Sequence, residues 1–269
     1  MNIIIERPFA TTEKGKRRNN EDYIYPSSEL AGPDRRLFIV CDGVGGSEKG
    51  EIASELACDS FETYFNTFLE EGDNPSEAFI QKAVRYTESR FDEYVKHNPE
   101  AQGMATTFAL LYIGNKGITV AYAGDSRIYQ FRDGQIIFKT EDHRLVNSLV
   151  KLGKITEEEA ERHPQKNVIT KAIIGSEHIT SADVQLITDL EPGDMFFLCT
   201  DGVTETFTDR ELEKIFNKKN NSEEIKNTIV ERCINQSNDN YSFYIIPIFD
   251  TKKNANYKQN ILSFFYSFA

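Results

Sequence analysis

Two short apolar runs, each closed by an aspartate and a glycine, most constrain how this chain can fold. The first is Leu-Phe-Ile-Val-Cys at 37–41, followed by Asp42-Gly43. The second is Met-Phe-Phe-Leu-Cys at 195–199, followed by Thr200 and then Asp201-Gly202. Runs with almost no polar residues are typical of strands that are buried on both faces. We therefore expect two buried strands, each ending in a tight turn.

The hydrophobic periodicity of the remaining chain predicts a mixed α+β domain. Helical spacing marks four segments, at 49–70, 76–97, 208–216 and 222–235. Strand-like runs lie at 2–12, 106–114, 116–125, 126–134, 135–140, 183–189 and 242–249. The four runs between 106 and 140 are separated by turn residues, which predicts an antiparallel meander. Two helix pairs could each cover one face of a two-sheet sandwich.

A length of 269 residues fits one large domain. We predict a single domain over 1–249, with a polar, irregular segment at about 142–180 that has the character of a functional lid, or flap. Short helical pieces are expected within it near 144–152 and 156–162. A C-terminal tail follows at 250–269; it either packs on the domain and frays, or serves as a docking peptide.

Bulk composition excludes several classes of protein. The net charge of −12 argues against nucleic-acid binding, which needs basic surface. The N-terminal apolar run is three isoleucines, too short for a signal peptide, and no run approaches the length of a membrane-spanning helix. These features predict a soluble, cytoplasmic protein. The cysteines form no CxxC pair, so buried thiols are expected at Cys41, Cys58, Cys199 and Cys233.

Acidic residues fall at the boundaries of the apolar strands. They are Glu21, Asp22, Asp42, Asp125, Asp201 and Asp239. Any single Asp-Gly is most simply a turn, and the acidic balance alone mostly reflects solubility. Carboxylates at the ends of neighbouring buried strands would, however, be desolvated and close together, and would then take up protons or need cations. Oxygen-only ligands suit hard cations such as Mg²⁺ or Mn²⁺.

A pair of such cations can lower the pKa of a water molecule and neutralise a phosphate. The remaining requirement is a group that orients the phosphate, and an arginine fork suits two phosphate oxygens. Arg17 and Arg18 stand four and three residues before Glu21. Without the acids, this basic run would be read as a solvated loop.

At this point the chain resembles the PPM family of Mg²⁺/Mn²⁺-dependent protein phosphatases, also called PP2C-type. The matching stretches run in the family's order over about residues 17–249. They read RRNNED (17–22), DGVGG (42–46), GMATT (103–107), AGDSR (123–127), DH (142–143), TDG (200–202) and DNYS (239–242). The segment from Asp142 to about Ala172 is similar to the flap of the bacterial branch.

The resemblance implies a four-layer α–β–β–α sandwich and a role for each site residue. Asp42 would bridge two metals with the Gly43 carbonyl as a further ligand, and Asp201 and Asp239 would complete one metal site. Glu21 and Asp22 would hold metal-bound waters, and Arg17 would grip the phosphate. Asp125 with Asp201 would supply a weaker third metal site. The implied reaction is hydrolysis of phosphoserine or phosphothreonine in proteins by a metal-bridged hydroxide, opposing a bacterial Ser/Thr kinase.

The sequence also departs from the family pattern. Val44 stands where animal members carry His, Arg144 stands where the flap usually has Ser, and 236–238 lacks the common Gly. The sequence lacks the motifs of three other classes of enzyme. It has no Cys followed six residues later by Arg, as in cysteine-based phosphatases, no GxxxxGK followed by Ser or Thr, as in P-loop enzymes, and no DxD motif of haloacid-type phosphatases. Two alternatives stay open: a phosphatase-like regulatory domain that binds phosphoproteins without turnover, and a plain α+β binding module whose Asp-Gly turns are only turns.

Overall fold

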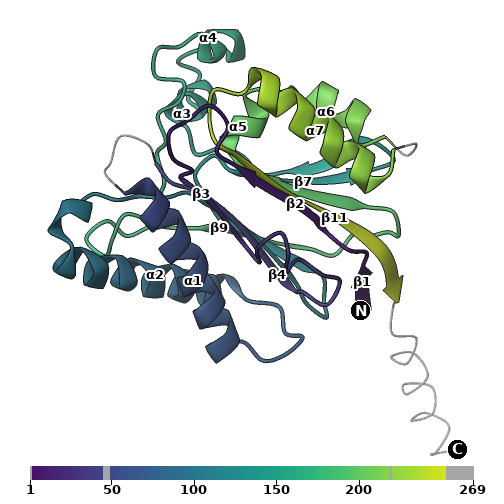
Figure 1. Ribbon diagram of the computed structural model, residues 1–269, viewed down its shortest axis with the longest axis horizontal. Helices are drawn as coiled ribbons and strands as arrows, with labels where there is room; N and C mark the ends of the chain where they lie inside the picture. Colours follow the sequence, from purple (N-terminus) through teal and green to yellow (C-terminus); the bar gives the residue numbers. More distant parts are fainter. Residues whose placement is uncertain (1, 45–48, 218–219, 253–269) are drawn as a thin grey trace, which may run out of the picture.

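Two antiparallel sheets lie face to face between two layers of helices in the computed structural model (Figure 1). The structure describes residues 2–44, 49–217 and 220–252. This arrangement is the predicted four-layer α–β–β–α sandwich. The two outer layers of helices leave the central strands of both sheets buried on both faces, as the unbroken apolar runs at 37–41 and 195–199 require.

The first sheet has the strand order β3-β4-β5-β6-β9. Its strands are β3 (Asp22–Tyr25), β4 (Leu37–Asp42), β5 (Phe108–Ile113), β6 (Ile118–Ala123) and β9 (Asp183–Ile187). Helices α1 (Gly50–Phe68) and α2 (Glu77–His97) cover its outer face (Figure 1). A short 3₁₀ turn, η1 (Pro99–Ala101), follows α2. Both helices lie within about two residues of the ranges that the periodicity predicts.

The second sheet has the order β1-β11-β10-β7-β8, and β2 also pairs with β11. Its strands are β1 (Asn2–Ile5), β2 (Phe9–Glu13), β7 (Arg127–Arg132), β8 (Gln135–Lys139), β10 (Met195–Cys199) and β11 (Tyr241–Lys252). Three helices lie against its outer face, namely α5 (Asp201–Thr204), α6 (Asp209–Ile215) and α7 (Ser222–Gln236). The short α5 was not expected from the sequence.

Three apolar layers hold the sandwich together, and the alternation of each strand distributes its side chains between two of them. In β4, Ile39 and Cys41 face the helices α1 and α2, while Phe38 and Val40 enter the layer between the sheets. All four side chains are fully buried. The four cysteines are buried free thiols, as predicted.

The predicted meander over 106–140 is wrong. β5 pairs with β6 and β7 pairs with β8, but β6 pairs next with β9 whereas β7 pairs with β10 in the other sheet. The chain crosses between the sheets at Gly124-Asp125-Ser126, where Gly124 has a φ of +114° that suits only glycine. Strand periodicity reports which face is buried and cannot tell which sheet a strand joins.

Smaller differences concern the ends of the chain and the flap. The predicted strand 2–12 is two strands, β1 and β2, which pair with successive parts of the long β11. The expected short helices of the flap are present as α3 (Leu145–Lys151) and α4 (Glu157–Glu161). β11 continues to Lys252, past the predicted strand end at 249, and the rest of the predicted tail lies outside the described residues.

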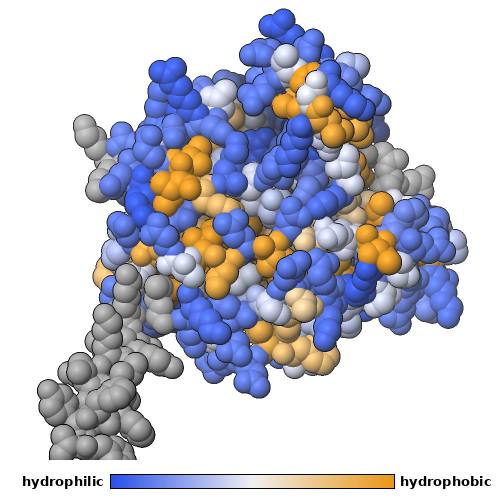
Figure 2. Space-filling view, turned by 180° about the vertical axis from the view of Figure 1, so that it is seen from behind, coloured by the Kyte–Doolittle hydropathy of each residue, from blue (hydrophilic) through white to orange (hydrophobic). Residues whose placement is uncertain are grey.

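The surface bears on which partners the chain could meet. Figure 2 shows one face as mostly hydrophilic, with several separate hydrophobic areas on it. Within the three described ranges, no helix combines the length and the apolar character needed to cross a bilayer.

Candidate metal centre

The acids singled out from the sequence gather at one edge of the sandwich, where strands of both sheets end. Asp42 is the last residue of β4, and its register partner in β3 is Asp22. Asp201 follows β10 at the start of α5, and Asp239 precedes β11. Asp125 lies at the crossing between β6 and β7. Because buried strands from two stacked sheets end together, residues far apart in sequence become neighbours.

The backbone around Asp42 is held from both sides. Its amide donates to the Thr107 hydroxyl at 3.2 Å, and its carbonyl accepts from the amide of Thr107 and the hydroxyl of Thr106, each at 2.9 Å. The next residue, Gly43, donates its amide to the Glu21 carbonyl at 2.9 Å. A Cβ at Gly43 would lie 2.3 Å from the carbonyl oxygen of Gly50, so this close approach needs glycine.

Asn240 fastens the N-terminal loop to the loop that carries Asp239. Its side-chain oxygen accepts from the Glu21 amide at 2.9 Å, and its amide group donates to the carbonyls of Lys14 and Asn19 at 2.8 Å. Arg17 lies in the same loop, half exposed, with Nη2 2.5 Å from Asp239 Oδ2. The sequence motif contained Asn240, but its role as the connection between the two loops was not foreseen.

Burial and mutual repulsion raise the pKa values of these acids. Burial raises the pKa of Asp42 well above its usual range, and the charges of Asp201, Asp22, Asp125 and Asp239 raise it further. For Asp201, burial followed by Asp125 and Asp239 raises the pKa to about 8. Burial raises the pKa of Asp22 to about 7, although its Oδ2 accepts a hydrogen bond from Thr200 at 2.8 Å. Acids in this state need protons or cations.

The donor set fits a hard divalent cation. Oxygens of Asp201, Asp239 and Glu205 all lie within 4.8 Å of one another. Glu205 is exposed and was not among the predicted residues. It stands four residues after Asp201, and the short helix α5 brings residues four apart to the same side. Because α5 was not expected from the sequence, Glu205 could not be placed beside Asp201. Only carboxylate oxygens contribute to this group, which suits Mg²⁺ or Mn²⁺ better than zinc.

Asp125 has a different set of neighbours from the other acids. It is 2% exposed, and its Oδ2 lies 2.8 Å from both Nε and Nη2 of Arg144. Its Oδ1 has no hydrogen-bond partner in the described part of the chain. The sequence shows Arg144 at the flap position where the family usually has Ser, but it does not predict that Arg144 contacts Asp125.

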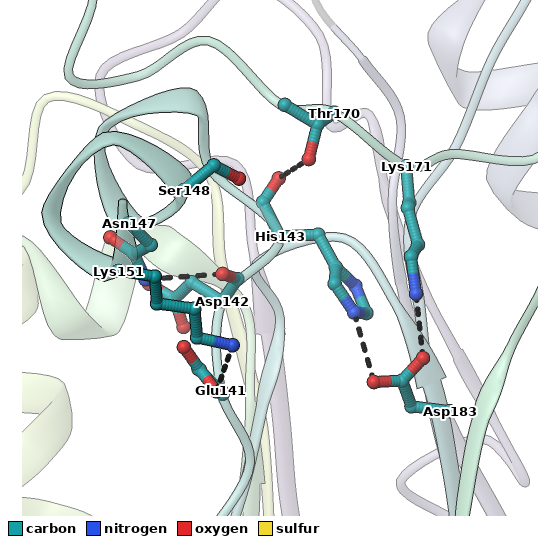
Figure 3. Close-up of a pocket in the computed structure, with 9 residues that line it drawn as sticks. All are labelled: Glu141, Asp142, His143, Asn147, Ser148, Lys151, Thr170, Lys171 and Asp183. Atoms are coloured by element: carbon teal, nitrogen blue, oxygen red, sulfur yellow. Dashed lines mark hydrogen bonds and ion pairs between the residues drawn. The ribbon is translucent and has the colours of Figure 1, made fainter. Parts of the chain in front are cut away.

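A cavity of about 230 Å³ opens beside this edge at the base of the flap (Figure 3). Figure 3 shows His143 and Lys171 turned toward Asp183, at 3.4 Å and 2.6 Å. The Thr170 hydroxyl donates to the His143 carbonyl at 3.0 Å. Burial lowers the pKa of His143, so Lys171 is the cation that pairs with Asp183 near neutral pH. His143 before the flap and Lys171 after it thus both contact Asp183 of β9.

The fold and the site together define a class: a two-sheet α+β sandwich with a cluster of carboxylates at one edge that could hold a metal ion. Residues 14–237 match the family model described as Protein phosphatase 2C. The chain belongs to this protein phosphatase 2C family.

Relatives within the family have been named for their activity. The chain is 36% identical over 201 residues to "Protein phosphatase PhpP" of Streptococcus pneumoniae, covering 74% of this chain and 79% of that one. It is 33% identical over 214 residues to "Serine/threonine protein phosphatase PstP" of Mycobacterium tuberculosis, covering 78% of this chain but only 38% of that relative's length.

A solved structure supports the likeness of fold. The catalytic domain of PstP in complex with two manganese ions superposes with a TM-score of 0.74 at 28% identity, over 93% of this chain and all of that one. The family and the α+β sandwich predicted from the sequence are therefore confirmed. The roles of single residues at the centre stay predictions.

Proposed function

We propose that this chain hydrolyses phosphoserine and phosphothreonine in proteins with the help of two divalent cations, Mg²⁺ or Mn²⁺. The observation that carries the proposal is the gathering of carboxylates at one edge of the sandwich, where desolvation, followed by the charges of neighbouring acids, raises the pKa of Asp42 well above its usual range and that of Asp201 to about 8. A charge distribution of this kind is stable when cations are present. The names of the bacterial relatives supply the reaction.

The residues would divide the work as follows. Asp42, Asp201 and Asp239 bind the cations, with the Gly43 carbonyl beside them, while Glu21 and Asp22 orient water around them. Bound cations of this kind supply a hydroxide-like nucleophile near neutral pH and neutralise phosphate oxygens. Asn240 keeps the loop carrying Glu21 against the loop carrying Asp239. Precise placement of this kind is what lets a cluster of acids act as one centre.

Arg17 is the proposed phosphate contact. Its guanidinium reaches Asp239 from the edge of the centre and is half exposed, so donors remain available to a phosphate oxygen. Phosphoproteins are the proposed substrates, and a cognate Ser/Thr kinase and a cytoplasmic location are part of the same proposal. The retained aspartates argue for turnover rather than for a regulatory domain that only binds phosphoproteins.

The test is turnover of a phosphothreonine peptide with Mn²⁺, with and without a chelator. Asp42→Asn removes a charge shared by the whole cluster and should lower kcat/KM at least ~100-fold. Asp189→Asn makes the same chemical change on the surface, where the side chain is 80% exposed, and should leave turnover unchanged. Wild-type turnover by Asp42→Asn, or full activity in excess chelator, contradicts the proposal. Peptide binding without phosphate release would instead favour the regulatory alternative.

A further inference from the structure

Arg144 stands at the root of the flap, directly before α3. Its backbone forms an isolated bridge with Ile169, and the amide of Leu145 donates to the Val168 carbonyl at 2.9 Å. The segment entering the flap and the segment leaving it are therefore joined at this point. The Arg144 side chain is 17% exposed and extends from this root toward the acids.

The guanidinium of Arg144 lies between two of the acids at the centre. Nε and Nη2 are each 2.8 Å from Asp125 Oδ2, and Nη2 is 3.8 Å from Asp201 Oδ2. Asp125 is almost fully buried, and the Arg144 contact is the ion pair that the structure gives it. Two donors on one oxygen make a short, charge-assisted contact.

A second arginine explains why Arg144 turns toward Asp125 rather than toward the nearer acid in sequence. Asp142 accepts from Arg127 through both carboxylate oxygens, each at 2.7 Å. Arg144 approaches Asp142 only to 3.6 Å. Asp142 therefore already has a cation, whereas in the described part of the chain Asp125 and Asp201 form ion pairs with Arg144 alone.

Asp125 and Asp201 are the pair that family resemblance implies for a third, weaker metal. In this chain a fixed positive charge already lies between them. A divalent ion entering the same space would meet that charge and would lose the Asp125 oxygen that the guanidinium engages. The residue that usually follows Asp-His in the flap is serine, which would leave the space open.

We propose that Arg144 serves as a built-in cation in place of a third metal, so that the chain binds two divalent ions and its flap is tied by charge to Asp125 and Asp201. The inference rests on the proposed two-metal function. It assigns Arg144 a positioning role, because the side chain acts on the acids and on the flap root.

Counting bound manganese tests the proposal. Electron paramagnetic resonance of unbound Mn²⁺ during titration gives the number of ions taken up at saturation, independently of turnover. The wild type should take up two ions. Arg144→Ser should take up three, and Arg144→Ser combined with Asp125→Asn should return to two, because the carboxylate that holds the extra ion is gone.

The outcomes separate this inference from the proposed function. Three ions in the wild type overturn the role of Arg144 and leave the phosphatase proposal standing. If Arg144→Ser has the same Tm as the wild type but takes up only two ions, the role of Arg144 is again overturned and the phosphatase proposal stands. A wild type that takes up no manganese overturns both.

Discussion

At the scale of single residues, the acids of the centre oppose folding until something neutralises them. Asp201 illustrates the conflict, since burial and the charges of Asp125 and Asp239 raise its pKa to about 8. A raised pKa means that the folded state binds the proton more tightly than the unfolded chain does. Stability in the absence of metal should therefore fall as pH rises toward 8.

Asp201→Asn should raise the stability of the metal-free protein and reduce the stabilisation that added metal gives. Above pH 8 and without metal, the variant should be more stable than the wild type by ~1 kcal/mol or more, because one repelling charge is gone. Added Mg²⁺ should raise the wild-type Tm and raise that of the variant much less. Circular-dichroism melts with chelator and with Mg²⁺ measure both, and Asp189→Asn is the matched surface control. A metal-free variant less stable than the wild type would argue against burial and neighbouring charge as the source of the raised pKa of Asp201.

Arg17→Ala should act mainly on substrate binding. Losing one arginine contact to phosphate should raise KM about tenfold and change kcat less. Steady-state kinetics on the phosphothreonine peptide measure the split. Arg18→Ala removes the same charge from the neighbouring exposed position and should leave KM unchanged. If the two variants exchange these results, the phosphate contact is Arg18.

At the scale of elements, short helices are fixed by their caps. Thr208 and Glu211 form a capping box at the start of α6, and Glu211 also accepts from Arg232 at 2.7 Å. The Thr208 backbone amide, Arg232 and the Thr208 hydroxyl lower the pKa of Glu211 to about 2. This group supports folding above its ordinary pKa, and its contribution is lost as pH falls toward 2.

Glu211→Gln should therefore destabilise the protein near pH 6, with the difference from wild type shrinking between pH 4.5 and pH 2. Glutamine can still cap the helix but lacks the charge that Arg232 binds. Thermal unfolding across that pH range is the measurement. Glu223→Gln, at an exposed position in the first turn of α7, is the control. A difference that does not depend on pH would show that the charge of Glu211 contributes nothing.

Most elements were predictable from the sequence because periodicity records burial. α1 and α2 lie close to their predicted ranges, and so do the two short helices of the flap. The membership of β7 was not predictable, because its pattern is the same whichever sheet it joins. That error matters for the site, since the crossing before β7 is what brings Asp125 to the acids.

At the scale of the whole molecule, the sandwich converts sequence distance into spatial proximity. The sequence predicts that Asp42 and Asp201 lie close together if the apolar strands that they follow are neighbours, and the stacked sheets meet that condition. Glu205 and Arg144 could not be predicted beside them, because one depends on a single helical turn and the other on the path of the flap. Side chains that reach a site from irregular segments leave no periodic signal.

On the proposed function, acids from both sheets jointly hold a pair of hard cations. Crystals grown with MnCl₂ and measured at the manganese absorption edge test it most directly. We expect two anomalous peaks against Asp42, Asp201 and Asp239. No peak at this edge of the sandwich, or manganese bound only to acids elsewhere, would contradict it.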